Sequence, residues 1–151
     1  MRIEEDVKLD FKDVLIRPKR STLSSRKEVD ISREYQFRWS GQRYKGIPII
    51  AANMDGVGTT EMARAFGWMG SGMTVALHKH YDIDTLLDFF KKKERKNAWY
   101  SIGVSDTDED KLKAFLKKAP KGTLTKLCID VANGYSQPFR SEEHTSELQS
   151  H

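Results

Sequence analysis

The chain has 151 residues, of which 38% are hydrophobic and 32% charged, and its formal net charge is +4. This length suits one ordinary domain, and no apolar run approaches the roughly 20 residues that a membrane-spanning helix needs. The basic residues are scattered among acids without a nucleic-acid-binding motif, so we expect neither nucleic acid nor a membrane as a partner. The acidic start (MRIEEDVKLDF) is unlike a signal peptide, and the single cysteine, Cys128, excludes an internal disulfide, which together favour a cytoplasmic protein.

Residues 1–46 have the character of a polar N-terminal leader with one apolar pattern. Six hydrophobic residues between Val7 and Ile16 precede Arg17 and Pro18. They predict short strands or a hairpin, followed by a loop rich in serine and arginine over residues 21–27. We therefore expect 1–46 to be a leader or hairpin region.

From Ile47 the chain alternates between short apolar runs and helical patterns. Strands are predicted over Ile47–Ala52, Met73–Leu77, Ala98–Gly103 and Leu124–Val131, and helices over Thr60–Met69, Ile83–Lys93 and Asp108–Lys118. This alternation predicts an α/β fold with parallel strands and right-handed crossovers. It fits the first half of a (β/α)8 barrel or a doubly wound sheet, since a full barrel needs ~250 residues. A half-barrel leaves strand edges unpaired, so we expect it to be unstable alone.

The last twelve residues, Arg140–His151 (RSEEHTSELQSH), have no apolar periodicity. They match a translation of the adapter that is ligated to short-read sequencing libraries. We therefore expect 140–151 to be a non-native, adapter-derived tail that does not belong to the fold. The alternative is a natural polar C-terminus, which a native exon encoding this peptide would establish.

Polar residues follow each predicted strand at its carboxyl end, where α/β proteins gather their binding and catalytic groups. Among these residues, Lys79 and Asp130 form the most promising pair, because an ammonium beside a carboxylate can relay a proton. An ion pair that only fixes two loops is an equally good interpretation. The polar groups are Asn53 to Asp55, His78 to His80, Ser105 and Asp106, and Asp130, Asn133 and Gly134.

Three other features favour structural roles. His78 and His80 could form a metal pair, but no third ligand has a suggestive spacing, so packing or loop hydrogen bonds are favoured and no metal site is expected. Cys128 lies in an apolar run and is interpreted as a buried structural thiol. Gly56-Val57-Gly58 predicts turn geometry rather than a phosphate-binding loop.

Four segments of the chain resemble the IMP dehydrogenase/GMP reductase family. The wording IIAANMD and HKHY is typical of its reductase branch, and the short stretch after Tyr81 leaves no room for the regulatory insert of the dehydrogenases. The segments, which occur in family order, are LDFKDVLIRPKRSTLSSR (Leu9–Arg26), GIPIIAANMDGVGT (Gly46–Thr59), ALHKHY (Ala76–Tyr81) and CIDVANGYS (Cys128–Ser136).

The resemblance implies a homotetrameric TIM-barrel enzyme of purine nucleotide interconversion that converts GMP to IMP and ammonia with NADPH. It also implies that residues 47–139 form the first four β/α units of an incomplete barrel. A cysteine attacks the guanine, which divides deamination and reduction into two easier steps. In the family that cysteine and a potassium site lie beyond residue 139, so we expect this chain alone to be inactive. The alternatives are an IMP dehydrogenase or a truncated, non-catalytic paralogue that acts as an interaction subunit.

The resemblance also implies roles for individual residues. Position 56 is glycine where the family usually has threonine, and Ile102 and Val104 stand where many reductases have threonines near the departing ammonia. The implied catalytic residues are Lys79 and Asp130, the substrate-binding residues are Asn53 and Met54, and the cofactor-binding residues are Ser25, Arg26, Lys79, Asp130, Val131 and Ala132.

Overall fold

The structure is a computed structural model, and it describes residues 6–38 and 40–135. The chain divides into two compact units at residue 30. The predicted tail at 140–151 lies outside the described residues, as does Ser136 of the fourth family segment. Among the described residues, no helix has the length and apolar character to cross a membrane.

The first unit contains two short 3-10 helices, η1 (Phe11–Asp13) and η2 (Arg26–Glu28). The strands predicted between Val7 and Ile16 are not found there. Instead, Asp10 caps η1, because its carboxylate accepts the Phe11 N–H at 2.7 Å while the Asp10 N–H donates to Asp13 at 3.0 Å. Such local side-chain hydrogen bonds compete with strand pairing for the backbone N–H groups, which is why the apolar pattern was misleading.

The hairpin of residues 1–46 is formed by β1 (Arg33–Gln36) and β2 (Arg43–Gly46), which pair antiparallel with Tyr35 opposite Tyr44. It clusters with the second unit, which begins at Ile31. The Tyr44 hydroxyl lies 2.7 Å from the Ile47 carbonyl oxygen and 2.6 Å from that of Gly72. This side chain therefore ties the hairpin to the sheet.

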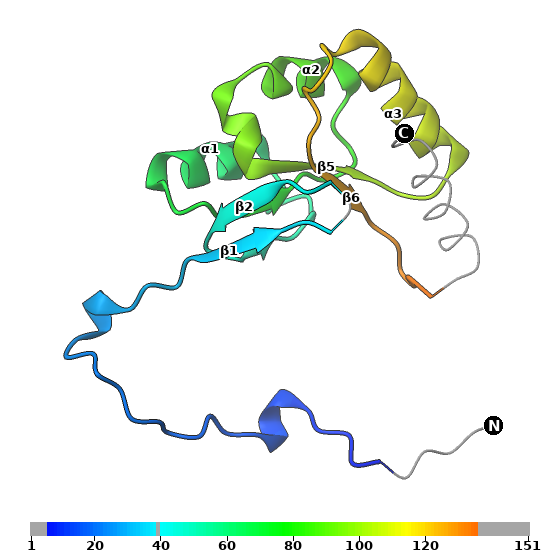
Figure 1. The fold of residues 1–151 in the computed structure, drawn as a ribbon. Coiled ribbons are helices and arrows are strands. Elements are labelled where there is room, and N and C mark those ends of the chain that lie inside the picture. The colour runs from blue at the N-terminus through cyan, green and yellow to red at the C-terminus, as the bar shows by residue number, and fades with distance from the viewer. Residues whose placement is uncertain (1–5, 39, 136–151) are drawn as a thin grey trace. The chain divides into compact units, whose positions relative to one another are not determined.

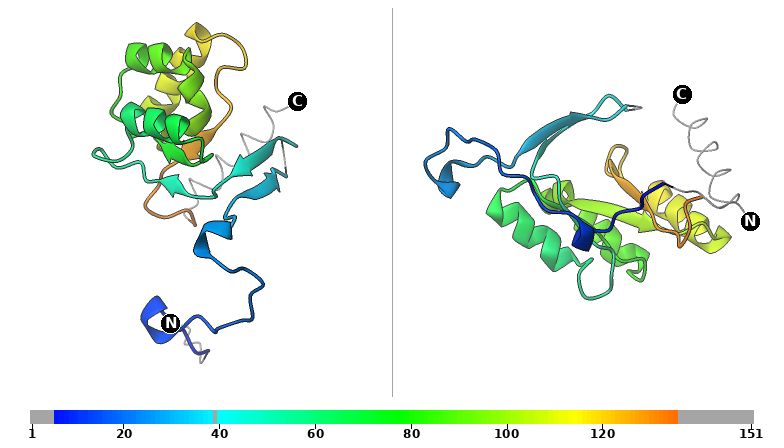
Figure 2. Two further views of the ribbon diagram at one scale, coloured as in Figure 1. Left: turned by 90° about the vertical axis from the view of Figure 1, so that its left-hand side faces the viewer. Right: turned by 90° about the horizontal axis from the view of Figure 1, so that it is seen from below.

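The second unit is built on a four-stranded parallel sheet with the strand order β3-β4-β5-β6. The helices between successive strands lie together on one face of this sheet (Figures 1 and 2). A sequential order with one-sided helices is a singly wound arrangement, and it differs from the doubly wound alternative. The bounds are β3 Ile50–Ala51, α1 Thr60–Met69, β4 Thr74–Ala76, α2 Ile83–Phe90, η3 Lys93–Asn97, β5 Ala98–Ile102, α3 Asp106–Lys118 and β6 Leu127–Ile129.

The helix bounds show how capping decides where a helix begins and ends. Thr59 caps α1, which spans the predicted residues, and Gly70 ends it in the left-handed region at φ 60°. Helix α3 begins two residues earlier than predicted, at Asp106, because Ser105 is its N-cap. Helix α2 ends at Phe90, three residues before the predicted end, and η3 follows it.

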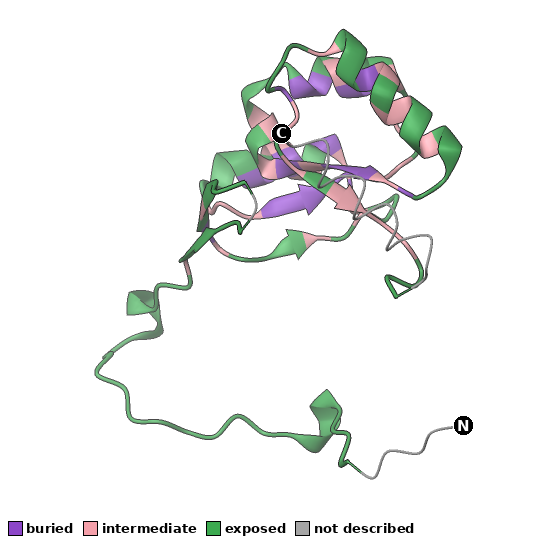
Figure 3. Ribbon diagram, turned by 45° about the vertical axis from the view of Figure 1, so that its right-hand side comes forward, coloured by how far each residue is buried: buried purple, intermediate pink, exposed green. Residues whose placement is uncertain are grey.

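The core lies between the helices and the sheet (Figure 3). Phe115 of α3 packs against Tyr100 of β5 and Phe90 of α2, with ring centroids 5.0 and 5.5 Å apart. The other sheet face is less covered, since Ile50 is 53% exposed and Cys128 is only half-buried. The predicted buried thiol is thus half-buried. The buried core residues are Ala63, Phe66, Val75, Leu77, Leu86, Phe89, Phe90, Ala98, Tyr100 and Phe115.

Candidate functional site

The carboxyl ends of β4 and β6 bring Lys79 and Asp130 together, as the sequence predicts. The Lys79 Nζ atom lies 3.3 Å from Asp130 Oδ2, and the two side chains are 35% and 41% exposed. The Asp130 N–H donates to the Ile102 carbonyl at 2.8 Å, which continues the β5–β6 ladder past the end of β6. The pair is therefore held by the sheet and remains open to a ligand from solvent.

The loop after β4 is fixed to the start of α1 through Tyr81. The His78 ring stacks on the Tyr81 ring with centroids 3.9 Å apart and planes at 15°. The Tyr81 hydroxyl accepts the backbone N–H of Thr60 at 3.1 Å, and the Lys111 ammonium donates to the Lys79 carbonyl at 2.7 Å. These contacts hold the backbone that carries Lys79.

The two histidines have different surroundings. His80 lies 3.5 Å from Asp55, with both side chains about three-quarters exposed, whereas the Nδ1 atom of His78 is buried and has no partner among the described residues. Their ring centroids are 6.0 Å apart. Within residues 6–38 and 40–135, no three side chains gather as a metal site. The stacking of His78 agrees with the packing role that the sequence favours.

The loop after β3 is a tight turn that places Asn53 and Met54 near the same strand ends. Asn53 is half-buried and Met54 is 65% exposed. The Met54 carbonyl accepts the N–H groups of Val57 at 2.9 Å and Gly58 at 2.6 Å. Because these N–H groups are already used within the turn, they are not available to a phosphate, and the turn interpretation of Gly56-Val57-Gly58 is confirmed.

The two glycines of this turn differ in their surroundings. A Cβ atom on Gly58 would lie 2.6 Å from the Ala76 carbonyl oxygen and 2.8 Å from the His78 nitrogen. A Cβ atom on Gly56 would meet nothing within 4 Å. Nothing in the described structure therefore requires glycine at position 56, where the family resemblance leads us to expect threonine. Gly58, in contrast, allows the loops after β3 and β4 to touch.

Sequence reasoning missed Asp108, which stands in the first turn of α3. A Cβ atom on Gly103 would lie 2.5 Å from Asp108 Oδ2 and 3.6 Å from Lys79 Nζ, so both charged groups flank the end of β5. Ser105 donates to the Asp108 carboxylate at 2.6 Å and holds it there. The available signal was that an acid in the first turn of a helix after a strand sits at the strand's carboxyl end.

Asp108 also affects the tyrosine below it in the core. Burial, helped by the negative charge of Asp108, raises the pKa of Tyr100 to about 12. Its hydroxyl has no hydrogen-bond partner among the described residues. Tyr100 is thus a neutral core residue rather than a proton donor of the site.

The remaining predicted site residues lie in two places. Val131 and Ala132 directly follow Asp130 on the second unit, half-buried and exposed respectively. Ser25 and Arg26 belong to the first unit, where the Ser25 hydroxyl accepts the Lys27 N–H at 3.3 Å and caps η2. Ile102 is half-buried beside the core, and Val104 is 41% exposed.

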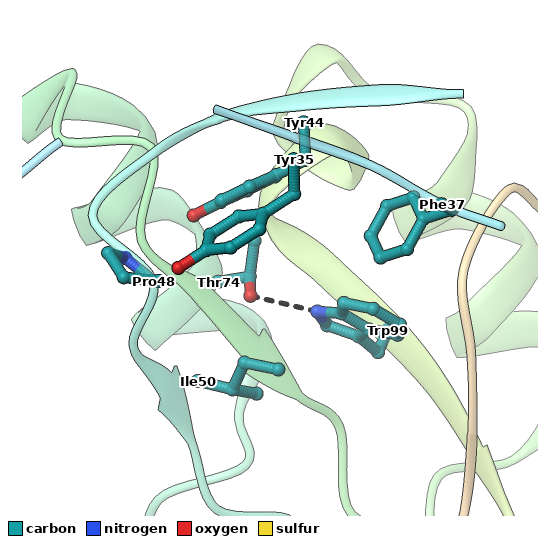
Figure 4. Close-up of a pocket in the computed structure, with 7 residues that line it drawn as sticks. All are labelled: Tyr35, Phe37, Tyr44, Pro48, Ile50, Thr74 and Trp99. Atoms are coloured by element: carbon teal, nitrogen blue, oxygen red, sulfur yellow. Dashed lines mark hydrogen bonds between the residues drawn. The ribbon is translucent and has the colours of Figure 1, made fainter. Parts of the chain in front are cut away.

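A small apolar pocket of about 150 Å³ lies at the opposite, amino end of the strands (Figure 4). Aromatic side chains of the hairpin face the first residues of β3 and β4, and the Trp99 Nε1–H donates to Thr74 Oγ1 at 2.8 Å. We interpret it as a packing gap between hairpin and sheet, because its lining is almost entirely apolar and its Tyr44, Thr74 and Trp99 polar groups are hydrogen-bonded within the protein. It is lined by Tyr35, Phe37, Tyr44, Pro48, Ile50, Thr74 and Trp99.

No model of a known protein family matches the chain. Curated proteins do match it over 142 residues and 92% of its length: it is 51% identical to "GMP reductase" of Salmonella paratyphi C, 51% to that of Klebsiella pneumoniae and 49% to that of Edwardsiella ictaluri. The chain spans about two-fifths of the length of these relatives, since the match covers 40% of each. Over the stretch that aligns, the chain is thus similar to GMP reductases at about half of its positions.

Proposed function

We propose that the protein containing this chain is a GMP reductase that converts GMP, NADPH and two protons to IMP, NADP⁺ and an ammonium ion. The observation that carries this proposal is the identity of 49–51% to curated GMP reductases over 92% of the chain. The pairing of Lys79 with Asp130 at 3.3 Å supports it, because the reaction needs proton transfer to a departing amine.

The chain, in this proposal, forms the first part of a (β/α)8 barrel. The sequential order of four parallel strands supports this, since a barrel is wound in one direction with its helices outside. The partly exposed outer strands β3 and β6 are where further strands of the sheet would add. The tetramer and the cytoplasmic location belong to the same proposal and rest on the family resemblance.

We assign Lys79 and Asp130 to proton handling. The Lys79 ammonium donates a proton or a hydrogen bond to the leaving amine at C2 of the guanine, and Asp130 keeps the lysine oriented. Asn53 and Met54, on the turn after β3, are assigned to the purine. Because Met54 is 65% exposed, its side chain is free to contact the flat face of a base.

We assign NADPH, which supplies the hydride when bound, to Lys79 and the Asp130–Ala132 segment, and we assign Ser25 and Arg26 of the leader to the NADPH of a neighbouring subunit. An arginine suits a cofactor that bears several phosphates. We place the nucleophilic cysteine outside this chain, because Cys128 lies within β6. We likewise place the potassium site, which the resemblance implies, outside this chain.

The test uses the full-length protein that contains this chain, and follows NADPH oxidation with GMP alongside IMP and ammonia formation. We expect Lys79→Met and Asp130→Asn each to lower kcat by about 10²–10⁴-fold. The double variant should be little worse than Lys79→Met alone, because two groups that act as a unit are not additive. Lys121→Met, which removes an exposed lysine from a surface turn, should leave kcat unchanged.

Four outcomes contradict the proposal or one of its parts. Turnover of IMP with NAD⁺ but not of GMP with NADPH indicates an IMP dehydrogenase. No turnover of either, with incorporation into oligomers of an active reductase, indicates a non-catalytic subunit. A kcat that survives in Lys79→Met while the unfolding midpoint drops indicates that the ion pair only fixes the two loops. Turnover by the 151-residue chain alone contradicts the assignment of the nucleophile.

A further inference from the structure

A second hollow at the amino end of the sheet has a volume of about 430 Å³ and carries several basic residues. None of its described lining residues is acidic. We call it the basic hollow; its lining residues are Phe37, Gln42, Arg43, Tyr44, Lys45, Phe66, Gly67, Gly70, Gly72, Lys96, Asn97 and Lys126. It lies at the end of the strands opposite to Lys79 and Asp130, and an inference about it does not depend on the proposed function.

Tertiary folding brings the cations of the basic hollow together, since they come from β2, η3 and the residue before β6. Arg43 is paired with Glu34 at 3.7 Å, but Lys45, Lys96 and Lys126 form no ion pair with a described residue. Lys126 is half-buried, its ammonium donates to the Lys96 carbonyl, and burial lowers its pKa. A desolvated lysine without a carboxylate is costly unless a ligand compensates it.

The hollow also borders the carboxyl end of α1, and a simpler explanation is that the lysines only neutralise this helix end. The charge balance argues against it. The carboxyl end of a helix carries roughly half a negative charge, and Glu94, whose Cγ would lie 3.9 Å from a Cβ on Gly67, adds one more. Three unpaired lysines exceed these negative charges by more than one unit.

We propose that the basic hollow binds a small anionic ligand through its phosphate groups, which lie among Lys45, Lys96 and Lys126. Phosphate oxygens accept charge-assisted hydrogen bonds from ammonium groups, and several phosphates match several lysines better than one does. The aromatic side chains of Phe37, Tyr44 and Phe66 border the same hollow. A free polyphosphate and the phosphate chain of a nucleotide share this chemistry, and only the nucleotide would also contact the aromatic side.

The probe is inorganic tripolyphosphate, titrated at low salt by calorimetry into the full-length protein that contains this chain, with thermal unfolding as a second measurement. We expect saturable binding with a Kd below about 1 mM, weakened by added salt, and a midpoint that rises with ligand concentration. Lys45→Gln and Lys126→Gln should each weaken binding about tenfold. Lys121→Gln, an equal loss of charge at an exposed lysine outside the hollow, should bind as the parent chain does.

A comparison of ATP with tripolyphosphate identifies the class of ligand. ATP binding that is tighter than tripolyphosphate binding, and equally sensitive to Lys45→Gln, identifies a nucleotide as the ligand class; equal affinities identify the polyphosphate alone. If Lys126→Gln unfolds, the exposed Lys45 still provides the test. Absence of binding at millimolar tripolyphosphate, or equal weakening by Lys121→Gln, overturns the proposal. Lysine variants that lower stability without any tripolyphosphate binding establish the helix-end explanation.

Discussion

The substitution Gly58→Ala should destabilise the sheet unit, because this glycine allows two loops to touch. A Cβ atom there would lie 2.6 Å from the Ala76 carbonyl oxygen, 2.8 Å from the His78 nitrogen and 2.9 Å from the Asn53 Cα. All three are backbone atoms, so no side-chain rotation relieves the clash. The two loops would have to move apart to make room for the Cβ atom. This movement would strain the hydrogen bond from the His78 N–H to the Gly58 carbonyl, which is 2.8 Å long.

The magnitude follows from these two effects. Overpacking a tight site costs about 1–3 kcal/mol, and a lost backbone hydrogen bond costs about 1 kcal/mol. We therefore expect the free energy of unfolding to fall by about 2–4 kcal/mol, out of the 5–15 kcal/mol that is typical of a domain. With a urea dependence of about 2 kcal/mol per molar, the midpoint should move down by roughly 1–2 M.

The assay is urea unfolding of the full-length protein that contains this chain, followed by circular dichroism and tryptophan fluorescence. Gly56→Ala is the matched control, because a Cβ at position 56 meets nothing within 4 Å. That substitution should be neutral or stabilise the chain by up to about 1 kcal/mol through the unfolded state. The reasoning is refuted if Gly58→Ala has the parent midpoint, or if Gly56→Ala lowers the midpoint as far as Gly58→Ala does.

Three further predictions concern the hydroxyl groups of Tyr81 and Tyr100 and are tested by the same unfolding assay. Tyr81→Phe removes the acceptor of the Thr60 N–H at 3.1 Å and should lower the free energy of unfolding by about 1 kcal/mol; an unchanged midpoint contradicts this role. Tyr100→Phe removes a buried hydroxyl that has no described partner, so it should raise the free energy of unfolding by about 1 kcal/mol, and a lower value indicates a hidden partner. The pKa of Tyr100 is raised from 10.0 to about 12, so the unfolded state loses its proton first, and the free energy of unfolding should fall by up to about 3 kcal/mol between pH 10 and 12. Tyr100→Phe should remove that part of the pH dependence, and an unchanged slope would show that another group causes it.

The order and type of the elements from Ile47 onward were predictable because each carries a periodic apolar pattern of its own. Helix α1 coincides with its prediction, since a threonine cap and an αL glycine mark its two ends within the local sequence. The strands are shorter than predicted; β3 spans only Ile50–Ala51 of the six-residue apolar run. An apolar run in the sequence indicates which residues are buried. A strand forms only where those residues also pair with a neighbouring strand, so it can be shorter than the run.

The leader shows the opposite case. Its apolar residues between Val7 and Ile16 predicted strands, but the hairpin formed at Arg33–Gln36 and Arg43–Gly46, in a stretch without such a pattern. Most of this hairpin is exposed, and its position depends on distant contacts such as that of Tyr44 with Gly72. Contacts between residues 28 positions apart leave no periodic signal in the local sequence.

For the site, the sequence by itself determined which chemical groups follow each strand, and therefore that Lys79 and Asp130 would meet at one edge of a parallel sheet. Only the tertiary structure decided their 3.3 Å separation, the approach of Asp108, the stacking of His78 on Tyr81 and the gathering of three lysines in the basic hollow. The physical reason is the distance along the sequence over which each kind of interaction acts. Periodicity and capping act over a few neighbouring residues, whereas these contacts depend on how the crossovers place separate elements against one another.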